Sequence, residues 1–387
     1  MIINSCTMIR RTLESIVLNH CYQGKIILIM GARQVGKTTL LRQLVSKLRE
    51  PVAWLNLDEG DLRQELTLAR TSTEIRRVFG QNHPVVILDE AQQIPDIGRK
   101  LKLFHDTFPE VQIIASGSSA FDLQNSMHEP LTGRKLVFHL FPLSYAELRD
   151  YHSVREEQRL LMHRLIFGAY PEVVNRPGNE KMILQEISSS YLYKDILQIE
   201  GIRKSSMIEK LLIALALQLG QEVKYHELAS LVGGIDPATV EKYLDLLERT
   251  YVIFKLPALS RNLRNELKKG KKYYFYDNGI RNVLINNFQE MAYRLDKGAL
   301  WENYLLAERR KLVHYRLDVG PAYFWRTHDQ AEIDYLEEKD GYFDAYEIKW
   351  KSKSARPPAS FAAAYPQHRF YQLDTADYDH FLIEPGA

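Results

Sequence analysis

The stretch that decides the first fold prediction is GARQVGKT, residues 31–38, which follows the apolar run KIILIM at 25–30. An amphipathic stretch, KTTLLRQLVSKL at 37–48, begins within it. The pattern G-x-x-x-x-G-K-T between a strand and a helix is the signature of a phosphate-binding loop. Gly31 and Gly36 allow the tight turn that points backbone N–H groups at phosphate oxygens, beside the positive end of the helix.

We therefore expect this loop to bind a nucleotide. Lys37 is expected to reach the terminal phosphates, and the Thr38 hydroxyl to hold Mg²⁺. A glycine-containing turn without a ligand is the competing interpretation, but it does not explain the complete signature with a strand before it and a helix after it. The expected nucleotide contacts are Gly31, Ala32, Arg33, Gln34, Val35, Gly36, Lys37, Thr38 and Thr39.

Short apolar runs alternate with amphipathic stretches through the first third of the chain. Continuous apolar strands between helices are typical of a parallel sheet covered on both faces. The fold class is therefore predicted as α/β, with a P-loop domain over residues 1–150. The predicted strands are KIILIM (25–30), VAWLNL (52–57), PVVILD (84–89), VQIIAS (111–116) and KLVFHL (135–140).

Two carboxylates, Asp89 and Glu90, end the third of these runs in PVVILDEA at 84–91. Asp89 fits the partner of the Mg²⁺ ion, and Glu90 fits the carboxylate that orients an attacking water. A role as a helix N-cap would explain Asp89 alone but not the second acid beside it. The pair therefore indicates hydrolysis rather than binding alone.

Two further features add candidates to this site. In ASGSS (115–119), Ser116 or Ser118 could sense the γ-phosphate, although a plain Gly/Ser turn explains the spacing equally well. In EPLTGRKL (129–136), Arg134 follows a flexible turn. It is either an arginine finger that acts on a neighbouring subunit of a homo-oligomer, or a surface arginine.

Residues 151–290 are predicted to be mainly helical, with a winged helix over 207–256. Asp236 and Pro237 suit the N-cap and first position of its last helix. A basic run at 261–272 then follows, which is a candidate wing that contacts DNA phosphates or a solvated loop. Its cations are Arg261, Arg264, Lys268, Lys269, Lys271 and Lys272.

Residues 291–387 are predicted to form a second α/β domain with its own acidic residues. Glu302 lies on a predicted helix, Asp334 on a strand, and Glu347 with Lys349 in DAYEIKW on the next strand. This is the sequence order of the PD-(D/E)XK nuclease core. In that chemistry the carboxylates hold a divalent metal, Mg²⁺ or Mn²⁺, and the lysine orients or deprotonates a water. A surface ion pair between Glu347 and Lys349 is the simpler alternative.

The chain resembles the AAA-type ATPases of bacteria and archaea that carry a nuclease-like C-terminal domain. The resemblance rests on the order of GARQVGKTTLL, VVILDEAQ, ASGSSAFDL, LTGRKLVFHLFPLSYAEL and FGAYPEVV, together with YLYKDIL (191–197) and YFYDNGIRNVL (274–284). It implies ATP binding by residues 31–38, hydrolysis through Asp89 and Glu90, a sensor within 116–119 and Arg134 as a residue acting in trans.

Composition limits the other options. The net charge is only +2, so any surface for nucleic acid must be local. Two cysteines, Cys6 and Cys21, are too few for a disulfide framework. We expect no signal peptide and no membrane span, and thus a cytoplasmic protein. LLIALALQL at 211–219 is expected to be a buried helix.

Three functions remain open on the sequence alone. The first is an ATP-driven enzyme whose ATPase controls a metal-dependent nuclease acting on DNA. The second is a nucleotide-switched signalling or defence ATPase whose C-terminal domain binds a partner without cleavage. The third is an ATPase that remodels a protein partner through its helical middle.

Overall fold

The computed structural model describes residues 8–117, 131–190, 205–259, 270–318, 320–327, 329, 331–351 and 355–383. The chain forms two compact units. Unit 1 comprises Met1–Leu143, Ser189–Arg203 and Arg249–Tyr251, and unit 2 comprises Ser144–Ser188, Lys204–Glu248 and Val252–Ala387. Unit 2 therefore contains most of both the second and the third predicted domains, whose division into two stays a prediction.

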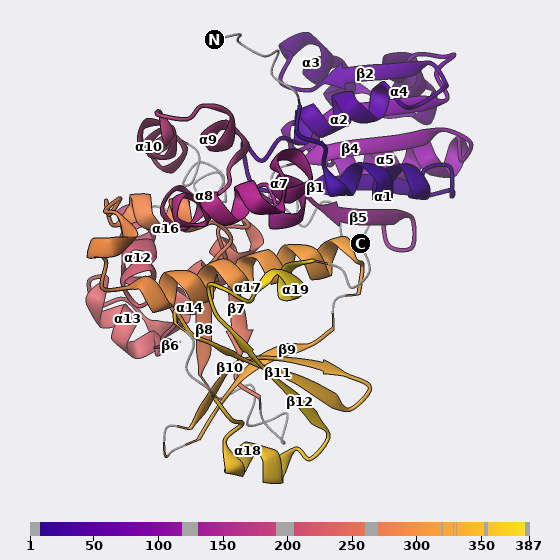
Figure 1. Ribbon diagram of the computed structural model, residues 1–387. Coiled ribbons are helices and arrows are strands. Elements are labelled where there is room, and N and C mark those ends of the chain that lie inside the picture. The colour runs from indigo at the N-terminus through magenta and orange to yellow at the C-terminus, as the bar shows by residue number, and fades with distance from the viewer. Residues whose placement is uncertain are drawn as a thin grey trace. The chain divides into compact units, whose positions relative to one another are not determined.

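Unit 1 is built on a parallel sheet whose strands follow the order β2-β3-β4-β1-β5 (Figure 1). All five predicted strands are confirmed. The elements are α1 (Thr12–His20), β1 (Ile26–Met30), α2 (Lys37–Val45), β2 (Val52–Asn56), α3 (Gly60–Leu68), α4 (Ser72–Phe79), β3 (Val85–Asp89), the 3₁₀ turn η1 (Ala91–Gln93), α5 (Ile97–Thr107), β4 (Gln112–Gly117) and β5 (Lys135–His139).

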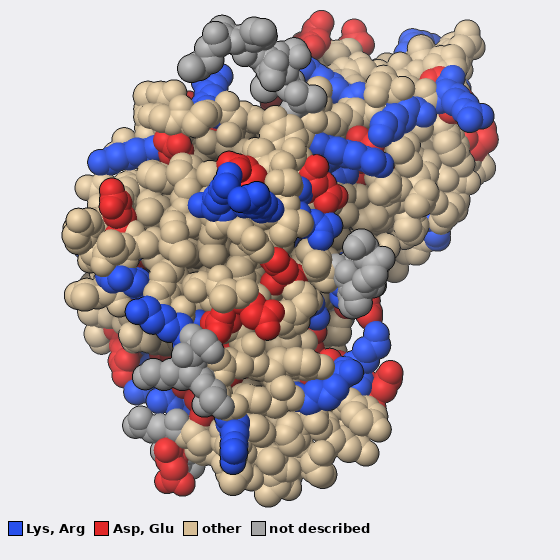
Figure 2. Space-filling model, in the orientation of Figure 1, with Lys and Arg blue, Asp and Glu red and all other residues tan. Residues whose placement is uncertain are grey.

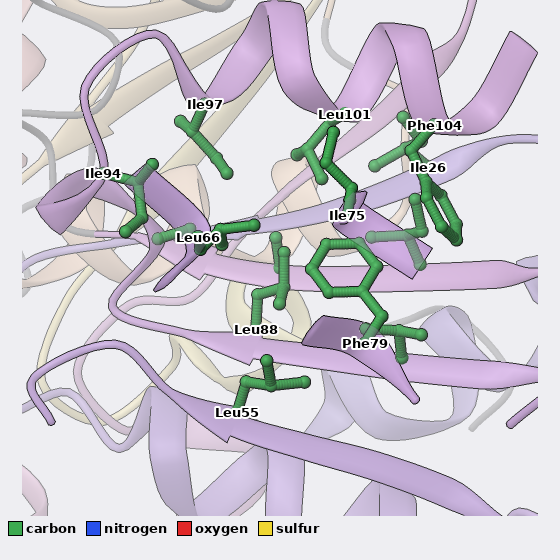
Figure 3. Close-up of a cluster of buried hydrophobic side chains, with 14 of the residues drawn as sticks. Ile26, Leu55, Leu66, Ile75, Phe79, Leu88, Ile94, Ile97, Leu101 and Phe104 are labelled. Carbon is green, nitrogen blue, oxygen red and sulfur yellow. The ribbon is translucent and has the colours of Figure 1, made fainter. Parts of the chain in front are cut away.

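Apolar side chains fill the space between this sheet and the helices on one of its faces. In Figure 3, Ile26 and Leu88 of the strands face Phe79 of α4 and Leu101 of α5. The rings of Phe79 and Phe104 meet edge to face with centroids 4.8 Å apart. Because the central strands β1 and β3 are buried on both faces, their sequences are continuously apolar rather than alternating.

Unit 2 combines helices with two small sheets. Its elements are α7 (Tyr145–His152), α8 (Val154–Phe167), α9 (Pro171–Asn175), α10 (Glu180–Ser190), α12 (Ser205–Leu217), β6 (Glu222–Val223), α13 (Tyr225–Leu231), α14 (Pro237–Arg249), β7 (Ile253–Pro257), β8 (Lys271–Phe275), α16 (Asn278–Leu284), η2 (Met291–Tyr293), α17 (Lys297–Tyr315), β9 (Ala322–Arg326), β10 (Glu332–Lys339), β11 (Tyr342–Ile348), α18 (Ala359–Ala364), β12 (His368–Leu373) and α19 (Asp379–Leu382).

The first small sheet is antiparallel, in the order β6-β8-β7. The order α12, β6, α13, α14, β7, β8 is the one expected of a winged helix, which itself stays a prediction. The expected start of α14 is confirmed: Pro237 is its first residue, and the Asp236 carboxylate accepts a hydrogen bond from the backbone N–H of Ala238 at 2.7 Å. The apolar run at 211–219 lies largely in α12, with Leu211, Leu212 and Leu215 buried.

The second small sheet has the order β12-β11-β10-β9, drawn in yellow-orange in Figure 1. β10 pairs antiparallel with both β9 and β11, and β12 pairs parallel with β11. Asp340 and Gly341 join β10 to β11 with φ values of 52° and 82°, as a tight two-residue hairpin turn requires. The hairpin that the sequence predicted between Asp334 and Glu347 is therefore confirmed.

A buried polar network holds the helices of unit 2 together. Asp277 caps α16 and also accepts a hydrogen bond from the backbone N–H of Ala169 at 2.7 Å. A side chain at Gly168, whose φ is +70°, would collide with this carboxylate. The Asn303 side chain, fully buried, donates to the carbonyl of Phe275 at 3.0 Å and accepts from its N–H at 2.7 Å. Asp277 thus joins the segment YFYDNGIRNVL to the segment FGAYPEVV, which contains Gly168 and Ala169.

Two further features concern the hydropathy of the helices and the charge of the surface. Within the described ranges, no helix is long and apolar enough to cross a membrane. Figure 2 shows Lys and Arg side chains mixed with Asp and Glu side chains over the visible face, as the small net charge leads one to expect.

Replacing Asn303 tests the network. We expect Asn303→Ala to lower the free energy of unfolding by about 2–4 kcal/mol, because it leaves buried backbone groups of Phe275 without partners. Urea denaturation followed by tryptophan fluorescence measures this, since Trp301, Trp325 and Trp350 lie in unit 2. Asn175→Ala, at an exposed position on α9, is the matched control and should change stability by less than about 0.5 kcal/mol. Equal stability of the two variants would contradict the assigned role.

Candidate functional site

The strand order of unit 1 brings three predicted site residues together. β4 lies between β1 and β3, so the carboxyl ends of these three parallel strands are neighbours. Asp89 at the end of β3 accepts a hydrogen bond from the Thr38 hydroxyl at 2.7 Å through one oxygen. Its other oxygen accepts a short hydrogen bond from the Ser116 hydroxyl on β4. Asp89 and Ser116 are 3% and 0% exposed, so both lie beneath the loop rather than on the surface.

The loop itself has the backbone of a phosphate-binding turn. Gln34 and Gly36 have φ values of 61° and 96°, and α2 starts at Lys37 directly after them. A positive φ at a residue other than glycine is a strained conformation that the surroundings must hold in place. Lys37 is only 5% exposed, and its ammonium donates to the carbonyls of Gly31 at 3.0 Å and Ala32 at 2.8 Å. The lysine is thus already turned over the loop.

Glu90 is held in a second strained turn. Its φ of 57° lies in the left-handed region, and its N–H donates to the Ser116 hydroxyl at 3.1 Å. Gln92 donates a short hydrogen bond to its carboxylate. Of the two sensor candidates, Ser116 contacts both carboxylate-bearing residues, whereas Ser118 lies outside the described residues. The positive φ at Glu90 turns the chain sharply at the end of β3, beside the loop, as an active-site residue often requires.

Two neighbours fix the position of the loop. A Cβ at Gly31 would collide with the carbonyl oxygen of Leu140, so only glycine fits between β1 and the end of β5. Arg11, which is 4% exposed, donates to the carbonyls of Val35 at 2.7 Å and Phe141 at 2.6 Å. The sequence prediction missed Arg11, because nothing in its local pattern separates it from an exposed arginine beside Arg10.

Arg134 lies away from the nucleotide loop of its own sheet. It precedes β5, and Lys135 pairs in parallel register with Ile26 at the start of β1. The loop at 31–38 leaves the opposite, carboxyl end of β1. The Arg134 guanidinium contacts Asp106 at 2.6 Å, and 38% of its side chain is exposed. Arg134 is therefore not brought to the nucleotide site within its own sheet, and only the role on a neighbouring subunit stays a prediction.

A second group of predicted residues meets on the C-terminal sheet. Tyr335 pairs with Tyr346, so the next step along the hairpin places Asp334 opposite Glu347. The Asp334 carboxylate accepts from the backbone N–H of Ile348 at 2.8 Å. Glu347 forms an ion pair with Lys349 at 2.5 Å. The ion pair between Glu347 and Lys349 that was the simpler alternative is therefore observed, and Asp334 lies beside it.

Glu302 joins this group from α17. Its carboxylate accepts from the Tyr274 hydroxyl at 2.5 Å and lies 3.6 Å from the Lys272 ammonium. Burial raises its pKa to about 7; Lys272 opposes that rise and Asp334 adds to it. Burial likewise raises the pKa of Asp334, and burial followed by the charge of Asp334 raises that of Glu347. The carboxylates are thus close enough to influence one another's protonation.

The implied second metal does not fit this cluster as it stands. In the part of the chain that the structure describes, no three His, Cys, Asp or Glu side chains are placed to hold a metal ion. The oxygens that would serve as ligands accept hydrogen bonds or ion pairs from Tyr274, Ile348, Lys349 and Lys272. The predicted residues Glu302, Asp334, Glu347 and Lys349 come together, but a metal-binding arrangement of the three acids is not formed.

The predicted basic wing requires a correction. Arg261, Arg264, Lys268 and Lys269 lie outside the described residues, but Lys271 and Lys272 lie in β8. Lys272 is buried with 3% exposed, and Lys271 contacts Tyr225 at 3.0 Å and Glu241 at 3.3 Å. The prediction that Lys272 contacts DNA phosphates is wrong, because its ammonium is buried in the protein.

Three family models match successive stretches of the chain. Residues 23–149 match a family model described as an AAA domain, residues 158–291 match a domain of unknown function (DUF8612), and residues 297–379 match another, DUF4143. Together with the geometry above, the first match supports an AAA-type P-loop domain in unit 1.

Proteins that align with most of the chain share about a quarter of its residues. An uncharacterized protein of Mycobacterium tuberculosis is 27% identical, covering 96% of this chain and 83% of that protein. One of Haemophilus influenzae is 26% identical, covering 81% and 80%. The solved structure of a Walker-type ATPase of Pyrococcus abyssi is 16% identical, covers 72% of this chain and 96% of that chain, and has a TM-score of 0.49.

Gly31 offers a test of the loop geometry. We expect Gly31→Ala to weaken the binding of a fluorescent ATP analogue at least about tenfold, because the added methyl displaces the loop from Leu140. Gly60→Ala is the matched control, since a Cβ there meets nothing within 4 Å. An unchanged affinity in folded Gly31→Ala protein would show that the close approach is not required.

Proposed function

We propose that this protein is a Mg²⁺-dependent ATPase. The observation that carries the proposal is the meeting of Thr38, Asp89 and Ser116 beneath a loop that carries the complete phosphate-binding signature. Two hydroxyls, that of Thr38 on α2 and that of Ser116 on β4, share the buried carboxylate of Asp89 on β3. A mere strand–helix turn needs no such carboxylate, whereas a nucleotide with its magnesium ion does.

The residues of the site fit the magnesium ion that the AAA domain implies. The Thr38 hydroxyl and the Asp89 carboxylate are hard oxygen donors already 2.7 Å apart. The Thr38 hydroxyl and the Asp89 carboxylate would hold the ion. When bound, Mg²⁺ would supply positive charge that offsets the negative charge developing on the phosphates of ATP.

The chain's own groups then have distinct roles. Backbone N–H groups of residues 31–39 and the start of α2 bind the phosphates, with Arg33 and Gln34 at the tip of the loop. To reach the terminal phosphates, the Lys37 ammonium exchanges the carbonyls of Gly31 and Ala32 for phosphate oxygens. Glu90 orients the attacking water and accepts its proton. The Ser116 hydroxyl accepts a hydrogen bond from the backbone N–H of Glu90 and donates one to Asp89, so it connects the two acidic residues.

Lys37 and Glu90 test the two steps separately. We expect Lys37→Ala to abolish ATP binding, because it removes the ammonium that is expected to reach the terminal phosphates. We expect Glu90→Gln to bind ATP within about threefold of the wild type but to hydrolyse it about 100-fold more slowly or worse, since the amide accepts no proton from water. Nucleotide titration and phosphate-release kinetics measure the two effects.

Glu65→Gln is the matched control, because Glu65 is exposed on α3. It should leave both binding and turnover unchanged. Wild-type turnover in Glu90→Gln would mean that another group orients the water.

Arg134 extends the proposal to an assembly. If it acts on a neighbouring subunit, turnover per subunit rises with protein concentration, and Arg134→Ala reduces the maximal rate by about 10³-fold. Arg63→Ala, an exposed arginine on α3, serves as the control and should not change the rate. Turnover that is independent of concentration, with sizing that shows a monomer, would remove this role.

For unit 2, we infer a C-terminal domain with a nuclease-like fold. The order α17, β9, β10, β11, α18, β12 and the meeting of Glu302, Asp334 and Glu347 support that assignment. The same fold serves as a docking platform in proteins that do not cleave. Contact with DNA, a protein partner in signalling, defence or remodelling, and a cytoplasmic location stay proposals on the sequence grounds given above.

A further inference from the structure

Lys272 occupies an unusual place for a lysine. Its side chain is 3% exposed, yet its ammonium forms an ion pair with Glu332 at 2.5 Å and lies 3.6 Å from Glu302. It also lies 5.2 Å from the centre of the Phe324 ring. Removing an ammonium from water is costly unless it is paired, so the carboxylates and the lysine must be held as one unit.

The two carboxylates reach Lys272 from distant parts of the chain. Lys272 belongs to β8, Glu302 to α17 and Glu332 to the start of β10, which lies 60 residues away in sequence. Burial alone would lower the pKa of Lys272, but the charges of Glu302 and Glu332 raise it above its ordinary value. The ammonium therefore stays charged and joins the three elements.

Metal chemistry makes different demands on these oxygens. Mg²⁺ and Mn²⁺ are hard cations that need several oxygen ligands, at about 2.1 Å for Mg²⁺. The Lys272 ammonium, hydrogen-bonded to Glu332 and 3.6 Å from Glu302, is a fixed positive charge beside these carboxylates and repels a second cation. The Glu302 oxygen near Lys272 also accepts the Tyr274 hydroxyl. A divalent metal bound to Glu302 would therefore lie close to a positive charge that the chain itself supplies.

We propose that Lys272 is the built-in cation of this cluster and supplies, beside Glu302, the positive charge that a divalent metal would bring to a nuclease of the resembled type. Lys349 neutralises Glu347 at the other end of the cluster. The C-terminal site is then assembled without metal and does not cleave phosphodiesters, which favours a platform for a partner over a nuclease. The inference rests on the nuclease-like fold proposed for unit 2 and is independent of the ATPase proposal.

Manganese binding by the full chain tests this. Nucleotide-free protein carrying Asp89→Asn, which removes the carboxylate proposed to hold the metal at the nucleotide site, is titrated with Mn²⁺ and followed by electron paramagnetic resonance. We expect this parent to bind no Mn²⁺ more tightly than about 1 mM, in the range of weak carboxylate sites. Adding Lys272→Met should create one site at least about tenfold tighter, which Glu302→Gln then removes.

Lys271→Met is the matched control. It removes the adjacent lysine of β8, whose partners are Tyr225 and Glu241 rather than the cluster, and should create no Mn²⁺ site. A folded Lys272→Met protein without the gain overturns the proposal. So does a parent that binds one Mn²⁺ below about 100 µM and loses it on Glu347→Gln, a result that decides the question even if Lys272→Met does not fold.

The readout is separate from ATP hydrolysis. A failure of the ATPase proposal would appear as absent turnover in the wild type and would leave the Mn²⁺ titration unaffected. Conversely, Mn²⁺ bound by Glu302 and Glu347 in the parent would restore the nuclease hypothesis without touching the assignment of Glu90.

Discussion

The candidate ATPase site depends on one buried carboxylate, that of Asp89. It accepts hydrogen bonds from Thr38 and Ser116, which arrive from the loop after β1 and from β4. This meeting is possible only because β4 lies between β1 and β3 in a parallel sheet. Parallel strands end at one edge, so a single strand order brings the phosphate loop, the acidic pair and the serine to the same place.

Unit 2 is organised around buried polar groups rather than an apolar core alone. Asn303 satisfies both backbone groups of Phe275, and Asp277 joins α16 to the segment after α8. Lys272 does the same for β8, α17 and β10 through charge. Each buried polar group is costly unless it is paired, so these contacts favour one arrangement of the helices over others.

The C-terminal cluster shows how one set of residues can support different chemistry. The order of Glu302, Asp334 and Glu347 along the chain matches that of a metal-dependent nuclease. The structure brings them together, yet it also adds Lys272 and Tyr274, which are not part of the nuclease pattern. A cation supplied by the chain itself changes an acidic cluster from a metal site into a closed ion-pair network.

The sequence by itself determined the phosphate loop, the five strands of the first sheet, the hairpin of β10 and β11 and the start of α14. These features depend on local rules, such as the glycine spacing of residues 31–38, apolar runs and the turn at Asp340 and Gly341. Only the tertiary structure decided the roles of Arg11 and Lys272 and the position of Arg134 away from the loop of its own sheet. The partners of a long cationic side chain lie far along the chain, and no local pattern records whether it is turned toward water or toward a buried carbonyl or carboxylate.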